Sequence, residues 1–491
     1  MAGARVFSPK RNDEARAVRR SRVGTDHRDA RTVGRMAWDF ETEPEFQAKL
    51  DWMESFVRDE IIPLETLAEE WRSPEGRATL RQITDPLKDE VRKQGLWAAH
   101  LPPEMGGLGF GQVKLGLMHE ILGQCVYAPG VFGNQAPDSG NAELIAVGGT
   151  EDQKERWMQP LLDGKLRSCF SMTEPTAGAD PTLLKTTATR DGDEWLINGH
   201  KWFSSNASIS DFLVVMARTG DQETAAYKSF SMFIVPTDTP GVNILRDVPT
   251  MGEPDHRTGE PGGHAEVIYD NVRIPFDNIV GGAEGIGQGF ALAQKRLGPG
   301  RIHHAMRWLG QSRRAFDMLC ERALSRYTHG SLLAEKQMIQ DWVAESYAER
   351  QAARLLTLHA AWRMDQLHAS GGHYSDARIE IGVIKFWGAK VLYNVIDRAI
   401  QIHGSLGYTS DLPLEAMYRH ARAARYMASR GMSEENPSDP CTWMARSITS
   451  WSTLAPQNLM SAISLRAAEA PFWSIIQAAW RVRRRAACIS A

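Results

Sequence analysis

The clearest structural signal in the chain is a pair of segments, Ser168-Cys-Phe-Ser-Met-Thr-Glu-Pro-Thr-Ala-Gly-Ala-Asp180 and Trp195-Leu-Ile-Asn-Gly-His-Lys-Trp-Phe-Ser-Ser-Asn206. The first is typical of a strand that runs into a turn, with hydroxyl and small residues around Thr173. The second has an Asn-Gly hairpin signal between apolar runs, then an aromatic residue and two hydroxyls. Such strands can hold a planar polar ring against Phe203, hydrogen-bonded by Ser205. Each segment alone fits an ordinary hairpin, but their order and joint pattern favour ring binding.

The residue pattern on either side of these strands is helical. From Phe46 to about residue 166, apolar residues recur at three- and four-residue steps, which predicts an N-terminal helical domain over residues 36–166. Short apolar runs separated by Gly, Asp and Pro predict a β domain over residues 167–282, an antiparallel barrel or sandwich. A glycine-rich loop then leads into a second helical block, residues 283–427. The predicted fold class is therefore α+β with several domains.

The two ends of the chain differ from this pattern. Residues 1–35 are rich in arginine, aspartate and alanine and have almost no large apolar residues, so we expect a disordered extension. A transit peptide is an alternative, although its acidic residues count against it. Residues 428–491 form a divergent tail with short apolar stretches. This tail is either an added extension or the product of a shifted reading frame or gene boundary, and the second interpretation is favoured.

Composition limits the classes of partner. The 491 residues carry a net charge of -3 with 24% charged residues, and the mean hydropathy is -0.37. These values predict a soluble protein that binds metabolites or proteins rather than nucleic acid or a membrane interior. We expect a cytoplasmic location, or the mitochondrial matrix in a eukaryote. The five cysteines are widely spaced and odd in number, which argues against a disulfide framework or a zinc site. Cys169 is interpreted as a small buried apolar residue.

Both strand segments resemble the flavin-binding strands of acyl-CoA dehydrogenases, and the resemblance extends from about Met36 to Met427. It includes four further motifs at the family's order and spacing, namely Pro103-Glu-Met-Gly-Gly-Leu-Gly109, Gly149-Thr-Glu-Asp-Gln-Lys154, Tyr269-Asp-Asn-Val-Arg-Ile-Pro275 and Gln401-Ile-His-Gly-Ser-Leu-Gly-Tyr408. The segment Arg301-Ile-His-His-Ala-Met-Arg307 looks most like the branch with long-chain and hydroxyacyl-type dehydrogenases. The resemblance implies that the C-terminal helical block is a four-helix bundle.

The resemblance also implies FAD as the cofactor and assigns its contacts. The isoalloxazine would contact Phe170, Met172, Thr173, Phe203 and Ser205. The adenosine diphosphate portion would contact Arg326, His329 and Gln337, because a guanidinium can pair with phosphate in a forked geometry. A neighbouring subunit would supply Gln401, Gly404 and Ser405 to the same FAD. The minimum functional unit is then a homodimer, and a homotetramer is common in the family.

The catalytic base is missing from the positions where the family carries it. The two expected carboxylate positions here are Ala428 and Gly300. Glu434 and Glu435 lie close in sequence to the first, but an exposed pair is the favoured interpretation. Arg301 matches the arginine beside the acyl-CoA site. The neighbouring His303 and His304 fit packing roles as well as proton transfer, and no residue grouping has metal-ligand spacing.

These assignments predict an FAD-dependent acyl-CoA dehydrogenase. It would oxidise the Cα–Cβ bond of an acyl-CoA to the trans-2-enoyl product and pass electrons to an electron-transfer flavoprotein. One alternative is a flavin monooxygenase or oxidase on the same fold, which would react quickly with oxygen after reduction. Another is a homologue that keeps FAD but is catalytically impaired, because a lost general base costs roughly 10²- to 10⁴-fold in rate.

Overall fold

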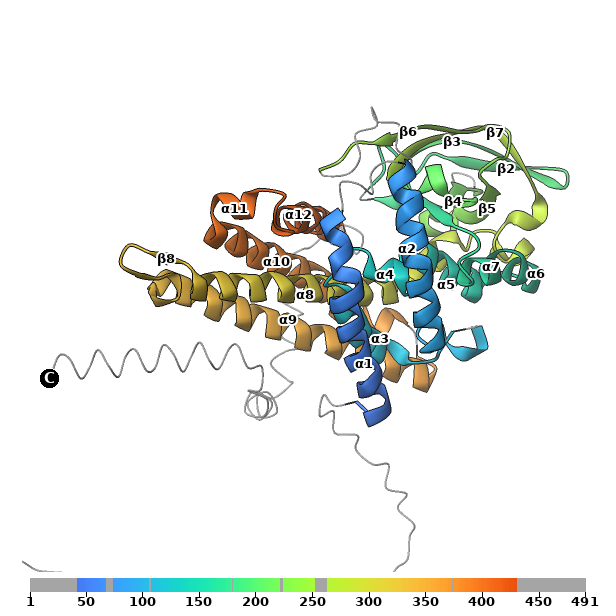
Figure 1. Ribbon diagram of the computed structural model, residues 1–491. Helices are drawn as coiled ribbons and strands as arrows, with labels where there is room; N and C mark the ends of the chain where they lie inside the picture. The colour runs from blue at the N-terminus through green and yellow to red at the C-terminus, as the bar shows by residue number, and fades with distance from the viewer. Residues whose placement is uncertain are drawn as a thin grey trace, which may run out of the picture. The chain divides into compact units, whose positions relative to one another are not determined.

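The computed structural model describes residues 42–67, 74–105, 107–178, 180–220, 224–251, 263–372 and 374–430. The predicted extension over residues 1–35 lies outside this part of the chain, as do Glu434, Glu435 and the predicted tail beyond residue 430. In the part that is described, helices are followed by a sheet and then by long helices, as Figure 1 shows. The predicted order helix, sheet, helix is therefore confirmed.

The first helical block buries the apolar face that its spacing predicts. Leu50, Met53, Val57 and Ile61 all lie in one hydrophobic cluster, and each is at most 8% exposed. The described helices of this block are α1 (Pro44–Phe56), η1 (Val57–Ile61), η2 (Ile62–Leu67), α2 (Pro74–Lys93), η4 (Pro103–Met105), α3 (Gly111–Leu122), α4 (Ala128–Val131), α5 (Asp138–Gly148), α6 (Glu151–Gln153), η5 (Lys154–Met158) and α7 (Gln159–Leu162).

The sheet contains seven strands in the order β1-β4-β2-β3-β7-β6, with β5 paired to β4. Most pairs are antiparallel as predicted, but β1 and β2 run parallel to β4, so the sheet is mixed. Because β1 also pairs with β3, strands β1, β4, β2 and β3 close on one another in a barrel-like ring. The strands are β1 (Ser168–Ser171), β2 (Thr187–Asp191), β3 (Glu194–Ser205), β4 (Phe212–Arg218), β5 (Phe230–Pro236), β6 (Val242–Val248) and β7 (His264–Pro275).

The Asn-Gly pair at residues 198–199 is not a hairpin turn, so that prediction was wrong. Strand β3 runs through it with only a shift in register between Ile197 and Gly199. The turn lies earlier, at Gly192, whose φ of +62° lets the chain reverse between β2 and β3. Gly199 is needed for close approach instead, because a Cβ there would lie 2.2 Å from the hydroxyl of Thr186.

The second helical block contains α8 (Gly289–Ser325), α9 (Gln337–Ser370), α10 (Arg378–His403), α11 (Ser405–Tyr408) and α12 (Leu414–Arg430). Helices α8, α9, α10 and α12 pack together, which confirms the predicted four-helix bundle. A short hairpin of β8 (Tyr327–Thr328) and β9 (Ser331–Leu332) separates α8 from α9. Within the described residues, no helix is apolar over a length that would cross a lipid bilayer.

Helix α8 joins the two helical blocks and the sheet. Its backbone approaches α3 closely, since a Cβ on Gly310 would lie 1.9 Å from the carbonyl oxygen of Glu120. Near the start of α8, Leu292 shares a hydrophobic cluster with Leu144 of α5 and Phe230 of β5. The start of α8 is thereby fixed against both α5 and the sheet. Cys169 is fully buried beside this region, in agreement with the prediction of a small apolar role.

Candidate active site

The end of β1 and the end of β3 meet where the sequence predicts a ring-binding site. Phe170 of β1 is paired with Ser205 of β3. Just beyond β1, the backbone N–H of Trp202 donates to the carbonyl of Thr173 at 2.8 Å. Met172 and Thr173 keep part of their accessible surface, unlike the fully buried Ser171 before them. Two segments separated in sequence therefore form one polar, part-exposed edge.

Phe203 and Ser205 both contact His264, a residue that the sequence analysis missed. The His264 ring stacks on Phe203 with 5.0 Å between ring centroids, and its Nδ1 lies 2.8 Å from the Ser205 hydroxyl. Phe203 has a φ of +55°, a left-handed conformation that is rare for a bulky residue and typical of functional sites. His264 begins β7, more than fifty residues further along the chain, so no local pattern connects it to Phe203.

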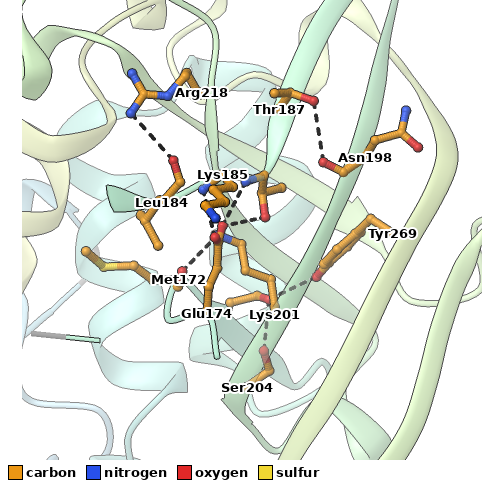
Figure 2. A network of polar contacts seen from close by, with 12 residues as sticks. Met172, Glu174, Leu184, Lys185, Thr187, Asn198, Lys201, Ser204, Arg218 and Tyr269 are labelled. Carbon is orange, nitrogen blue, oxygen red and sulfur yellow. Dashed lines mark hydrogen bonds and ion pairs between the residues drawn. The ribbon is translucent and has the colours of Figure 1, made fainter. Parts of the chain in front are cut away.

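A buried ion pair fixes the segment between the two strands, as Figure 2 shows. The Glu174 carboxylate accepts hydrogen bonds from the backbone N–H groups of Lys185 and Thr186 and from the Thr186 hydroxyl, at 2.6 to 2.9 Å. Lys201 of β3 adds a fourth donor at 3.0 Å and also donates to the carbonyl of Met172 at 2.8 Å. Residues 172 to 174 are thus tied to β3 through charged hydrogen bonds.

Burial opposes charge at both members of this pair. It lowers the pKa of Lys201 to about 8, although Glu174 partly offsets the effect. At Glu174 burial would raise the pKa, but Lys201 and the hydrogen bonds from Thr186 and Lys185 outweigh it, so the pKa stays below its usual value. Between about pH 4.5 and pH 8 both groups are therefore charged, and each stabilises the charge of the other. A second set of hydrogen bonds ties β7 to the same strands. The Tyr269 hydroxyl donates to the Ser171 hydroxyl, which is hydrogen-bonded to the Ser204 hydroxyl.

A pocket of about 210 Å³ lies beside the ion pair. Its volume is smaller than the roughly 300–1,000 Å³ of typical small-molecule sites, so it can hold part of a ligand but not a whole FAD. It is lined by Glu174, Pro175, Thr176, Lys185, Thr186, Gly199 and His200.

Neither expected base position carries a carboxylate in the fold. Gly300 lies within α8, and a Cβ added there would meet nothing within 4 Å, so the position faces open space. Ala428 lies in the last turn of α12 and is only 5% exposed. Arg301 follows Gly300 on α8 and is part-exposed. The geometry therefore places the proposed substrate arginine beside a position with free space.

Two further charged groups lie near Phe170, and the sequence analysis did not identify either one. Arg296 of α8 places its guanidinium carbon 3.9 Å from the centroid of the Phe170 ring. Glu143 of α5 is the acid that acts on it most strongly. Both residues keep part of their accessible surface, and removal of the carboxyl from water raises the pKa of Glu143 to about 8.

The histidines of α8 are packing residues in this fold. His303 is 8% exposed and stacks on His119 of α3 with 4.4 Å between ring centroids. Its Nε2 lies 3.1 Å from the side-chain oxygen of Gln112. Burial lowers the pKa of His303 to about 3, and burial and Arg307 hold that of His304 well below its usual value. In the described part of the chain, no three His, Cys, Asp or Glu residues are grouped to hold a metal.

The remaining predicted FAD contacts lie at the opposite end of α8. Arg326 caps the helix, whereas Arg301 is near its start, and 25 residues of helix at about 1.5 Å each separate them by roughly 37 Å. The rest of the group lies at element ends, with His329 in the β8–β9 turn, Gln337 at the start of α9, Gln401 in the last turn of α10, and Gly404 and Ser405 at the start of α11. Within one chain, these residues are therefore far from the residues at the β1–β3 edge.

Three family models match the chain in sequence order. The acyl-CoA dehydrogenase N-terminal domain matches residues 43–165, the middle domain residues 169–264 and the C-terminal domain residues 287–434. Together they cover the helical block, the strands of the sheet before β7, and the helical bundle described above.

Relatives and solved structures agree with these models. Probable acyl-CoA dehydrogenase FadE2 of Mycobacterium tuberculosis is 40% identical over 76% of this chain and 89% of its own length. Acyl-CoA dehydrogenase family member 11 of chicken is 38% identical over 76% of this chain, which spans only 47% of that longer protein. A Mycobacterium abscessus structure described as an acyl-CoA dehydrogenase is 36% identical, with a TM-score of 0.72 over 80% of this chain and 98% of that one. PigA, solved as an FAD complex, shares the fold at 19% identity with a TM-score of 0.67. The chain belongs to the acyl-CoA dehydrogenase family.

Proposed function

We propose that the protein is an FAD-dependent oxidoreductase that removes hydrogen from the α and β carbons of an acyl-CoA, giving the trans-2-enoyl thioester. The observation that carries the proposal is the meeting of Phe170 and Thr173 with Phe203 and Ser205 at one edge of the sheet. Family membership supports the same chemistry. An electron-transfer flavoprotein is the acceptor that the family implies.

The residues at this edge fit an isoalloxazine ring. Phe170, Met172 and Thr173 would hold one edge, while Phe203 and Ser205 would contact the ring at the end of β3. The fit is supported by a buried Nε of Arg296 that lacks a hydrogen-bond partner in the described structure, next to Phe170. When bound, FAD supplies the acceptor for the hydride that leaves the β carbon. The Glu174–Lys201 pair would hold residues 172 to 174 in place.

We also propose that two subunits complete each FAD site. Arg326, His329 and Gln337 would bind the adenosine diphosphate portion, and Gln401, Gly404 and Ser405 would approach it from the neighbouring subunit. The separation of these residues from the β1–β3 edge within one chain supports this arrangement. So do the neighbouring apolar side chains of Leu406 and Tyr408, which are 37% and 81% exposed. A homodimer is then the smallest active unit.

A second candidate function is an FAD-binding homologue with impaired catalysis. The observation in its favour is that Gly300 and Ala428 offer no carboxylate to take the α proton. An oxidase or monooxygenase remains the third alternative, and fast oxygen consumption with product formation would identify it.

The first experiment is an absorption spectrum of the purified protein before and after anaerobic addition of acyl-CoA thioesters of different chain length. Bleaching of a bound flavin by one thioester supports the dehydrogenase. A yellow protein that no thioester bleaches supports the impaired homologue. A colourless protein that does not take up added FAD contradicts both.

A base can be restored at Gly300 because a side chain there meets open space. We expect Gly300→Glu to raise the rate of substrate-dependent bleaching by roughly 10²- to 10⁴-fold, the usual contribution of a positioned general base. Gly300→Gln is the matched control, since it has nearly the same shape and no basic oxygen. Equal bleaching rates in the two variants would contradict the role of position 300.

A further inference from the structure

The Arg296 side chain is held between two elements by close packing. On one side its guanidinium carbon lies 3.9 Å from the centroid of the Phe170 ring in β1. On the other side is Gly140 of α5, where an added Cβ would lie 2.8 Å from the Arg296 Nε. Only glycine leaves room for the guanidinium at that point. The arginine is therefore fixed in one place by α5, α8 and the sheet together.

The charge of Arg296 is poorly compensated. Its Nε is buried without a hydrogen-bond partner in the described structure, and Glu143 is the acid that acts on it most strongly. Burial raises the pKa of Glu143 to about 8 and lowers that of Arg296 to about 10, so at pH 7 the carboxyl is mostly neutral while the guanidinium stays charged. A part-buried cation with an unpartnered buried donor is an attractive site for negative charge.

The location of this cation is the ring edge itself. Phe170, which the guanidinium covers, is the β1 residue in register with Ser205 of β3. A ligand that binds along that edge therefore lies next to the guanidinium. FAD becomes more negative when it accepts two electrons and one proton as a hydride, because the added electron pair exceeds the added proton by one charge.

We propose that the guanidinium of Arg296 binds the reduced, anionic form of FAD more tightly than the oxidised form. Arg296 would then act by placing a positive charge beside the cofactor. This inference rests on the proposed function, because it needs FAD at the β1–β3 edge. The site would favour electron transfer into the flavin by stabilising the state that the hydride produces. Glu143, kept neutral, does not cancel that field.

The test is a redox titration of the FAD-loaded protein without substrate, against a dye of known potential. Wild type is compared with Arg296→Gln, which removes the charge, and with Arg296→Lys, which keeps it. Lys295→Gln is the matched control, because the neighbouring Lys295 on α8 is exposed to solvent. We expect Arg296→Gln to weaken binding of reduced FAD about tenfold relative to oxidised FAD, which lowers the midpoint potential by about 30 mV for a two-electron couple.

The other variants separate charge from packing. We expect Arg296→Lys to retain most of the wild-type potential and Lys295→Gln to retain all of it. Equal potentials for wild type and Arg296→Gln overturn the inference alone, as does a loss in Arg296→Lys as large as that in Arg296→Gln. A wild-type protein that takes up no FAD overturns the proposed function and this inference with it.

Discussion

Replacing Lys201 with methionine should destabilise the ring-edge segment more than any surface ion-pair mutation. Methionine keeps the length and flexibility of the side chain but leaves Glu174 without its cationic partner. Removing one member of a buried pair costs about 3–5 kcal/mol. Glu174 keeps its three donors from Lys185 and Thr186, so the lower end applies, about 3 kcal/mol. Amide hydrogen exchange at Lys185 and Thr186 should then accelerate roughly a hundredfold, since about 1.4 kcal/mol is a factor of ten.

Lys165→Met is the control because it breaks an exposed ion pair whose N–O distance is even shorter. Lys165 lies 2.8 Å from Asp163, against 3.0 Å for Lys201 and Glu174, but the side chains are 72% and 36% exposed rather than 0% and 4%. An exposed pair contributes about 1 kcal/mol or less, so exchange at residues 185 and 186 should not change. If Lys201→Met also leaves their exchange within threefold of wild type, burial does not give this pair its strength.

Two other predictions follow from burial and close packing. The pKa of Glu143 is raised from 4.5 to about 8, so the unfolded chain loses this proton first and the folded state is progressively destabilised as pH rises between those values. Glu143→Gln should therefore raise the free energy of unfolding at pH 8.5 by at most about 5 kcal/mol, and with it the melting temperature. At pH 5 the substitution should change either quantity little. Calorimetry showing the same gain at both pH values would contradict this. Gly310→Ala should destabilise by about 1–3 kcal/mol in urea unfolding, because its Cβ would lie 1.9 Å from the Glu120 carbonyl oxygen. Gly300→Ala, with open space around it, should instead stabilise by up to about 1 kcal/mol, and equal effects at the two glycines would argue against the close approach of α3 and α8.

The sequence predicts the parts of the fold that depend on local periodicity. The helical stripe from Leu50 to Ile61 and the strands at residues 168 and 195 follow from the spacing of apolar residues, and each is present. The Asn-Gly pair in β3 was misinterpreted because its role depends on a distant residue. Thr186 of the neighbouring segment occupies the space that a side chain at Gly199 would need. A local rule cannot distinguish a tight turn from a glycine required by tertiary contact.

The charged groups of the candidate site were missed for a related reason. Arg296 follows Lys295, and such a pair is usually a solvated helix surface. Its burial results from Gly140, which is far away in sequence and leaves the necessary space. One signal was nevertheless available, because Arg296, His303 and Arg307 recur near helical spacing on α8 and put polar groups on a face that includes the buried His303. A polar stripe on a helix with many buried residues indicates a functional face.

The two missing carboxylates have different consequences. At Gly300 the surrounding space is empty, so a glutamate could enter without displacing any neighbour. At Ala428 the side chain is already buried, so an aspartate there would lose hydration and need a partner to remain ionised. Restoring a base is therefore a sharper test at position 300. If Gly300→Glu binds FAD and still fails to react with any thioester, the missing base is not what limits this chain.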